Sequence, residues 1–152
     1  MRRLVTDDGT ERIDFASASY LGLSFDRRLA EVLHQSVDGC GLYSYCSPIF
    51  LRPPAQIEVE RILSDLTGYE DCVLFQSATS LHCGVLPVLA SHKRPVFIDE
   101  HTHQSIFDAL RIAGNRRVYR FEHNSVESAG RLIARECVDT DSPILATDGV
   151  FS

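Results

Sequence analysis

The chain has 152 residues, is 44% hydrophobic and carries a formal net charge of −6 at pH 7, which is typical of a folded globular domain and excludes a disordered chain. The acidic balance argues against a nucleic-acid or anionic-membrane partner, because both need a concentrated basic surface. No apolar run approaches the roughly 18 to 20 residues that span a bilayer, and no apolar signal core follows Met1. We therefore expect a cytoplasmic protein with no membrane and no nucleic-acid partner.

The cysteines favour reduced packing residues over a disulfide framework or a zinc site. They are odd in number and no two have the spacing Cys-x-x-Cys. They are Cys40, Cys46, Cys72, Cys83 and Cys137.

The amino-terminal segment, residues 1–54, differs in pattern from the rest. Apolar residues at helical spacing, from Leu29 to Val37, predict one amphipathic helix. Residues 38–54 have no clear period and are rich in glycine, proline, serine and tyrosine, which predicts an irregular loop. A loop of this length is usually functional or covered by a partner.

Residues 55–152 alternate between helical and strand-like patterns. We expect helices near 59–66, 80–89, 106–113 and 126–137, and strands at 72–75, 96–98, 118–121 and 144–147. Asn124 is the expected cap of the last helix, with Glu127 as its capping-box partner. The alternation predicts an α/β fold with a mostly parallel sheet sandwiched by helices. No helix follows the last strand, so we expect a partial domain truncated at its carboxyl end.

Ligands in such sheets collect at the carboxyl ends of the strands. The turn Ser77–Ser80 opens a helix there, and its serine and threonine side chains suit two roles. Free N–H groups and the helix dipole would bind a phosphate, whereas Ser77 or Thr79 could simply cap the helix. Residue types alone leave both roles open.

A second turn carries two histidines, His101 and His103. Alternate histidines point apart and nothing nearby completes a ligand set, so we expect no metal site. A histidine at a strand's carboxyl end could stack on an aromatic ligand or act as an acid or base. A surface loop histidine without function is the alternative.

Six segments resemble, in order, motifs of the α-oxoamine synthases. This family is a branch of the fold type I pyridoxal-phosphate (PLP) enzymes, in the class I/II aminotransferase superfamily. The resemblance implies the aspartate-aminotransferase-like fold, with residues 55–152 forming part of its large PLP-binding domain. The segments are Ser19–Ser24, Leu66–Glu70, Ser77–Thr79, Asp99 with His103–Ile106, Phe121–Asn124 and Thr147–Ser152.

The resemblance also implies roles for individual residues. The backbone of Ser77, Ala78 and Thr79 would take the cofactor phosphate. His103 would be the catalytic residue that stacks on the pyridine ring, and Ser152 would lie beside the cofactor. The chain is most similar to the branch that makes α-aminoketone autoinducers.

The activity implied by the resemblance is the condensation of a small amino acid with an acyl-CoA. The products are an α-aminoketone, carbon dioxide and free CoA, and the partner is a second copy of the chain in a homodimer. A truncated or degenerate relative that binds cofactor weakly or pairs with another chain is the alternative.

The chain departs from the family pattern at four positions. Ser19 replaces asparagine or aspartate, Ala78 replaces glycine, Thr79 replaces an aromatic residue and His82 replaces asparagine. The family's Asp-x-x-His strand and Schiff-base lysine have no counterpart in the sequence. Lys93 is the only lysine, and it precedes a strand, at the end away from the expected site. The chain thus resembles an amino-terminal fragment that is inactive by itself.

Overall fold

The computed structural model describes residues 3–15, 17–41, 47, 49–90, 93–139 and 141–151. It divides into two units, Met1–Ile57 and Glu58–Ser152, each of which is described by itself. Within the described residues, no helix is both long and apolar enough to cross a bilayer.

The described residues of the first unit form a hairpin, a short 3₁₀ helix and a long α-helix. Its elements are β1 (Arg3–Val5), β2 (Glu11–Ile13), η1 (Leu23–Phe25) and α1 (Arg27–Cys40). The hairpin is antiparallel, with Arg3 opposite Ile13 in the strand register. The Arg3 guanidinium forms an ion pair with the Glu11 carboxylate at 2.8 Å. Asp26 caps the start of helix α1, where its carboxylate accepts the Arg28 N–H. Gly41 caps the end of the helix, with a φ of 77° that favours glycine. The predicted helix is confirmed, whereas residues 42–46 and 48 of the predicted loop lie outside the described residues.

Helix α2 begins within the first unit. The described elements after it are three strands, which form a parallel sheet, and three helices. The elements are α2 (Pro54–Thr67), α3 (Ala78–Leu89), β3 (Val96–Asp99), α4 (Gln104–Ile112), β4 (Val118–Phe121), α5 (Val126–Glu136) and β5 (Ile144–Ala146). The strand order is β4-β3-β5, with both pairs parallel. The predicted α/β architecture with a parallel sheet is confirmed.

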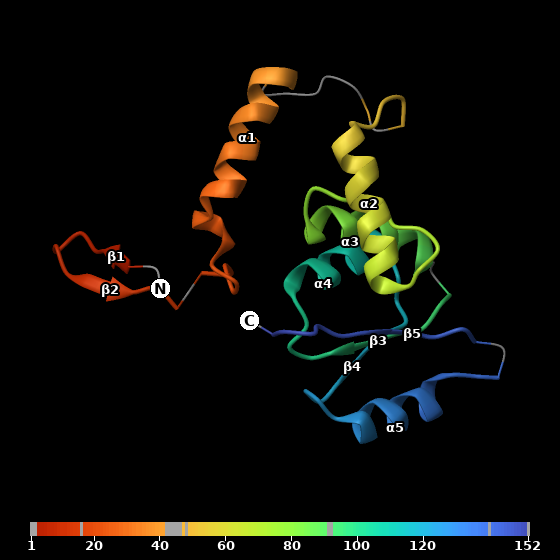
Figure 1. Cartoon of the computed structure of the whole chain (residues 1–152). Coiled ribbons are helices and arrows are strands. Elements are labelled where there is room, and N and C mark those ends of the chain that lie inside the picture. Colours follow the sequence, from red (N-terminus) through yellow and green to blue (C-terminus); the bar gives the residue numbers. More distant parts are fainter. Residues whose placement is uncertain are drawn as a thin grey trace. The chain divides into compact units, whose positions relative to one another are not determined.

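Helices lie on both faces of this sheet (Figure 1), and a layer of apolar side chains holds them to each face. Because successive strand residues point to opposite faces, Val96 and Ile98 face one layer and Phe97 the other. The first layer includes Ile106 and Leu110 of α4. The second is formed by α5, through residues such as Ala129. Helices α3 and α4 therefore cover one face and α5 the other.

A polar clamp joins the amino ends of the strands. The Arg117 guanidinium contacts both carboxylate oxygens of Asp141, at 2.9 and 2.8 Å, and also donates to the carbonyls of Lys93 and Glu136. The hydrogen bonds from Arg117 hold the pKa of Asp141 below its usual value. Lys93 is therefore fixed at the amino end of β3, as the sequence predicted.

Two local predictions are wrong. Residues 72–75 form no strand, because no strand of the described sheet lies beside them; Val73 is 70% exposed. The cap of α5 is Ser125, whose hydroxyl accepts the Ser128 N–H, and not Asn124. Asn124 has a φ of 54° and forms the turn that precedes the cap.

Candidate functional site at the carboxyl ends of the strands

Helix α3 begins at a serine pair. The Ser80 N–H donates to the Ser77 hydroxyl at 3.1 Å, and the Ser77 N–H donates to the Ser80 hydroxyl at 3.2 Å. The capping role considered for Ser77 is therefore confirmed. The N–H groups of Ala78 and Thr79 lie in the first turn, where a helix offers them no acceptor of its own. This turn is exposed and contains no acidic residue.

His103 is the N-cap of α4. Its Nδ1 accepts the Ser105 N–H at 3.2 Å and lies 2.7 Å from the Ser105 hydroxyl oxygen. The backbone N–H of His103 donates to Oδ2 of Asp148 at 2.7 Å. The ring therefore stands, exposed, where α4 begins and where the chain leaves β5.

Helices α3 and α4 are joined by a side-chain bond between His82 and Ser105. The Nδ1 atom of His82 lies 2.8 Å from the same Ser105 hydroxyl. In the sequence, His82 stands out only as a departure from a family motif. The contact is not predictable from the sequence, because residues 23 apart carry no local pattern that pairs them.

Asp99 ends β3 as a buried carboxylate. It accepts hydrogen bonds from the backbone N–H groups of His101 and Asn124 and from Nδ1 of His123, each at 2.9 Å. Burial raises its pKa, but these hydrogen bonds outweigh burial and the pKa is lowered overall. Asp99 is therefore an ionised anchor that ties the turn after β3 to the turn after β4.

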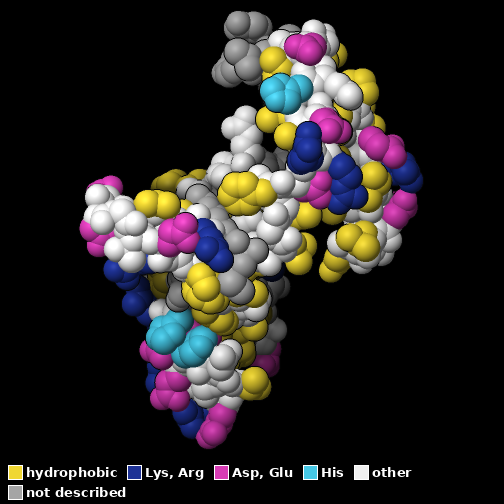
Figure 2. All heavy atoms as spheres, turned by 60° about the vertical axis from the view of Figure 1, so that its left-hand side comes forward, with side chains coloured by type: hydrophobic (Ala, Val, Ile, Leu, Met, Phe, Trp, Pro, Cys, Tyr) yellow, Lys and Arg dark blue, Asp and Glu magenta, His cyan; other side chains and the backbone are white. Residues whose placement is uncertain are grey.

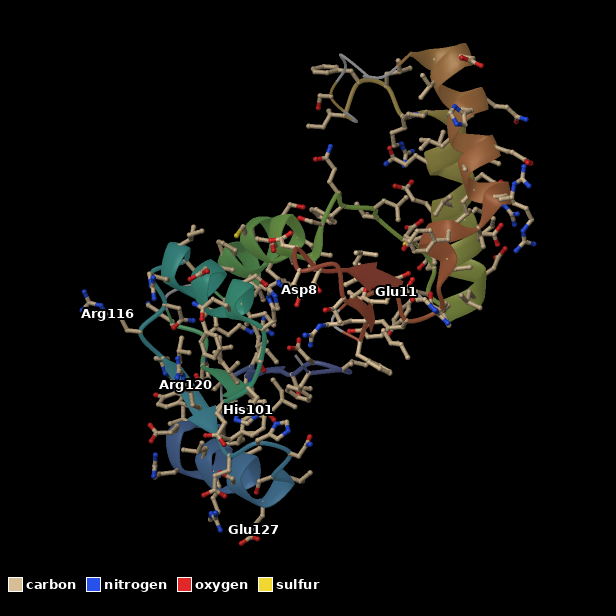
Figure 3. All side chains as sticks on the ribbon, turned by 90° about the vertical axis from the view of Figure 1, so that its left-hand side faces the viewer. Asp8, Glu11, His101, Arg116, Arg120 and Glu127 are labelled. Carbon is tan, nitrogen blue, oxygen red and sulfur yellow. The ribbon has the colours of Figure 1, made fainter. Side chains whose placement is uncertain are left out.

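The two histidines of the His-x-His pair belong to different clusters. His101 stacks on His123 with ring centroids 4.4 Å apart, and Phe151 meets His123 edge-on at 4.5 Å. Neighbouring histidine side chains are visible in the lower part of Figure 2, and His101 is labelled in Figure 3. Within the described residues, no group of three or more His, Cys, Asp or Glu side chains could hold a metal ion.

The predicted site residues lie as follows. Ser77, Ala78 and Thr79 form the start of α3, and His103 the start of α4, on the same face of the sheet. Ser152 lies outside the described residues. Lys93 is at the opposite ends of the strands from His103.

No family model matches the chain, but individual proteins resemble it in sequence and in structure. It is 36% identical over 156 residues to an 8-amino-7-oxononanoate synthase of Chromohalobacter salexigens, covering 99% of this chain and 39% of that protein. It is 32% identical to the 4-hydroxy-2,2'-bipyrrole-5-methanol synthase PigH of a Serratia species, covering 99% of this chain and 24% of that protein.

Solved structures of serine palmitoyltransferases resemble the fold of the chain. A Sphingomonas wittichii serine palmitoyltransferase superposes with a TM-score of 0.88 at 23% identity, over 99% of this chain and 37% of that one. The S. paucimobilis enzyme, with a bound PLP-myriocin aldimine, has a TM-score of 0.86 at 26% identity, over 95% and 36%.

The chain is a homologue of the α-oxoamine synthases. It spans about two fifths of the length of the 8-amino-7-oxononanoate synthase of Chromohalobacter salexigens. Its helices and parallel sheet match part of the PLP-dependent aminotransferase-like fold.

Proposed function

We propose that this chain forms part of the PLP site of a transferase that condenses a small amino acid with an acyl-CoA. The products would be an α-aminoketone, carbon dioxide and free CoA. The observation that carries the proposal is the position of the α3 start and of His103, on helices joined through His82 and Ser105. The homology along nearly the whole chain supports the same function.

The residues present fit PLP. The first turn of α3 offers unpaired N–H groups and a helix dipole to a phosphate, with no carboxylate to repel it. The His103 ring is exposed, and hydrogen bonds at its Nδ1 and its backbone N–H fix its position. A flat ring held in this way can stack on a pyridine ring.

Each residue then has a distinct part in the proposed site. PLP, when bound, supplies an electron sink for a carbanion at the amino-acid substrate. Ala78 and Thr79 would bind the phosphate through their N–H groups, and the Thr79 hydroxyl would offer a further donor. His103 would orient the ring face, and Ser152 would lie beside it. We further propose a cytoplasmic homodimer, since the resemblance implies that a second copy completes the site.

The phosphate site can be tested by placing a negative charge at the start of α3, which should repel phosphate without destabilising the helix. We expect Ala78→Asp to weaken PLP binding at least tenfold, about 1.4 kcal/mol, because a carboxylate at the first turn repels phosphate. The same carboxylate interacts favourably with the helix dipole and stabilises the helix by about 0.3–1 kcal/mol. The free energy of unfolding should therefore not fall. Absorbance titration with PLP and urea denaturation measure the two effects.

The matched control is Val126→Asp, which places the same carboxylate at the first residue of α5, on the other face of the sheet. It should leave the PLP titration unchanged. Equal affinity for PLP in the wild-type chain and in Ala78→Asp would contradict the phosphate site.

The 152-residue chain alone should form no stoichiometric PLP adduct and show no acyl-CoA condensation. Lys93 is exposed at the amino ends of the strands, whereas the proposed phosphate site at the start of α3 and His103 lie at the carboxyl ends. Borohydride reduction after titration, followed by peptide mapping, detects any lysine adduct. A stoichiometric adduct at Lys93 would overturn this assignment of the site.

A further inference from the structure

Three side-chain atoms lie in a row between α3 and α4. The Nδ1 atoms of His82 and His103 flank the Ser105 hydroxyl oxygen at 2.8 and 2.7 Å. Ser105 is only 4% exposed, so water has little access to its hydroxyl. The hydrogen bonds of this hydroxyl must therefore be made to the two rings.

The proton positions in this row follow from one obligatory donor. The backbone N–H of Ser105 points at Nδ1 of His103, and a backbone N–H can only donate. Nδ1 of neutral His103 is therefore unprotonated, and its proton is on Nε2. The Ser105 hydroxyl, which also contacts this nitrogen, has a single proton and must donate it to His103. His82 must then donate from its own Nδ1 to the hydroxyl oxygen.

We propose that His82 is a positioning residue, which keeps the proton of the Ser105 hydroxyl directed at Nδ1 of His103 and so fixes the plane of the His103 ring. The lone pair of Nδ1 lies in the plane of the imidazole ring, so two donors aimed at it fix that plane. His82 donates its proton to the oxygen of the Ser105 hydroxyl. The hydroxyl proton then has only Nδ1 of His103 as an acceptor.

The consequence for catalysis rests on the proposed function. A His103 ring with a fixed plane presents one face to a stacked cofactor without the entropy cost of ordering that ring. His82 itself needs no contact with the cofactor for this role.

The test reads the proton positions directly and needs no cofactor. In the wild-type 152-residue chain, labelled with ¹⁵N and studied above the free imidazole pKa of about 6.5, long-range ¹H–¹⁵N spectra distinguish protonated from unprotonated ring nitrogens. We expect His103 to carry its proton on Nε2 and His82 to carry its proton on Nδ1. A His82 proton on Nε2 in the wild-type chain overturns the proposal.

Three variants and one control sharpen the result. Ser105→Ala removes the hydroxyl, and His103→Ala frees it to turn, so either should release His82 from the Nδ1–H form. His82→Asn keeps a donor, its side-chain amide, and should leave His103 protonated on Nε2 with its ring still ordered. His101→Ala alters a histidine that stacks elsewhere and should change neither ring. An unchanged His82 in Ser105→Ala would also overturn the proposal.

This result is separable from the proposed function. The expected protonation pattern without PLP binding contradicts the proposed function but supports the positioning role of His82. PLP binding with His82 protonated on Nε2 supports the proposed function and contradicts the positioning role.

Discussion

Asp99 shows how one buried charge organises the turns at the carboxyl ends of the strands. It is 1% exposed and accepts from two backbone N–H groups and from His123. We expect Asp99→Asn to lower the free energy of unfolding at neutral pH by about 1–3 kcal/mol, because an amide cannot satisfy all three donors. Urea denaturation measures the change.

The pH dependence of this loss has a defined sign. The folded-state pKa of Asp99 lies below its usual value, so the carboxylate's contribution is present above the unfolded pKa of about 3.9. It is lost as pH falls through the folded value. The difference between wild type and Asp99→Asn should therefore shrink below about pH 4. A difference that grows on acidification would contradict the role given to Asp99.

At the site, single residues were partly predictable from sequence. His103 and the Ser77 turn could be found because each follows a predicted strand or opens a helix, which are local features. The Ser105 bridge could not, since it depends on how α3 packs against α4. Its only trace in the sequence is a histidine at position 82.

Among the elements, α5 provides a direct test of a corrected prediction. The side chain that caps α5 is Ser125, and Asn124 occupies the left-handed region just before it. We expect Ser125→Ala to cost about 1 kcal/mol of unfolding free energy. Asn124→Gly should change stability much less, because glycine adopts a positive φ without strain.

Thermal denaturation of both variants measures this difference. The control is Ser36→Ala on α1, whose hydroxyl bonds only the carbonyl one turn earlier and caps no helix. A larger loss of stability in Asn124→Gly than in Ser125→Ala would indicate that Asn124 is the cap of α5.

Elements were predictable where local pattern and tertiary partners agree. Strand β3 is buried on both faces and was correctly found from its continuous apolar run. Residues 72–75 have the same pattern but form no ladder, because a strand exists only where a neighbour accepts its hydrogen bonds. In this segment Leu74 donates its N–H to the Glu60 carboxylate instead, at 3.4 Å.

For the whole molecule, the sheet order leaves β5 at one edge. Leu145 on this strand is 56% exposed, and an apolar sheet edge of this kind favours pairing with another chain. We expect the isolated chain to self-associate and Leu145→Lys to reduce the association. Analytical ultracentrifugation over a range of concentrations measures both.

Ile112→Lys is the matched control, since Ile112 is 65% exposed but ends helix α4 instead of lying on a sheet edge. It should leave the association unchanged if the β5 edge is responsible. A wild-type chain that stays monomeric at all concentrations would contradict the expectation.

The clamp that holds Lys93 also makes the chain convenient to immobilise. Lys93 is the only lysine of the sequence, it is exposed, and its backbone is anchored by Arg117. Arg120 lies farther along β4, with its guanidinium over the Phe107 ring at 4.3 Å (Figure 3). Coupling through the lysine amine would therefore tether the sheet by the amino ends of its strands. His103 and the start of α3 would then lie at the ends of the strands opposite the point of attachment.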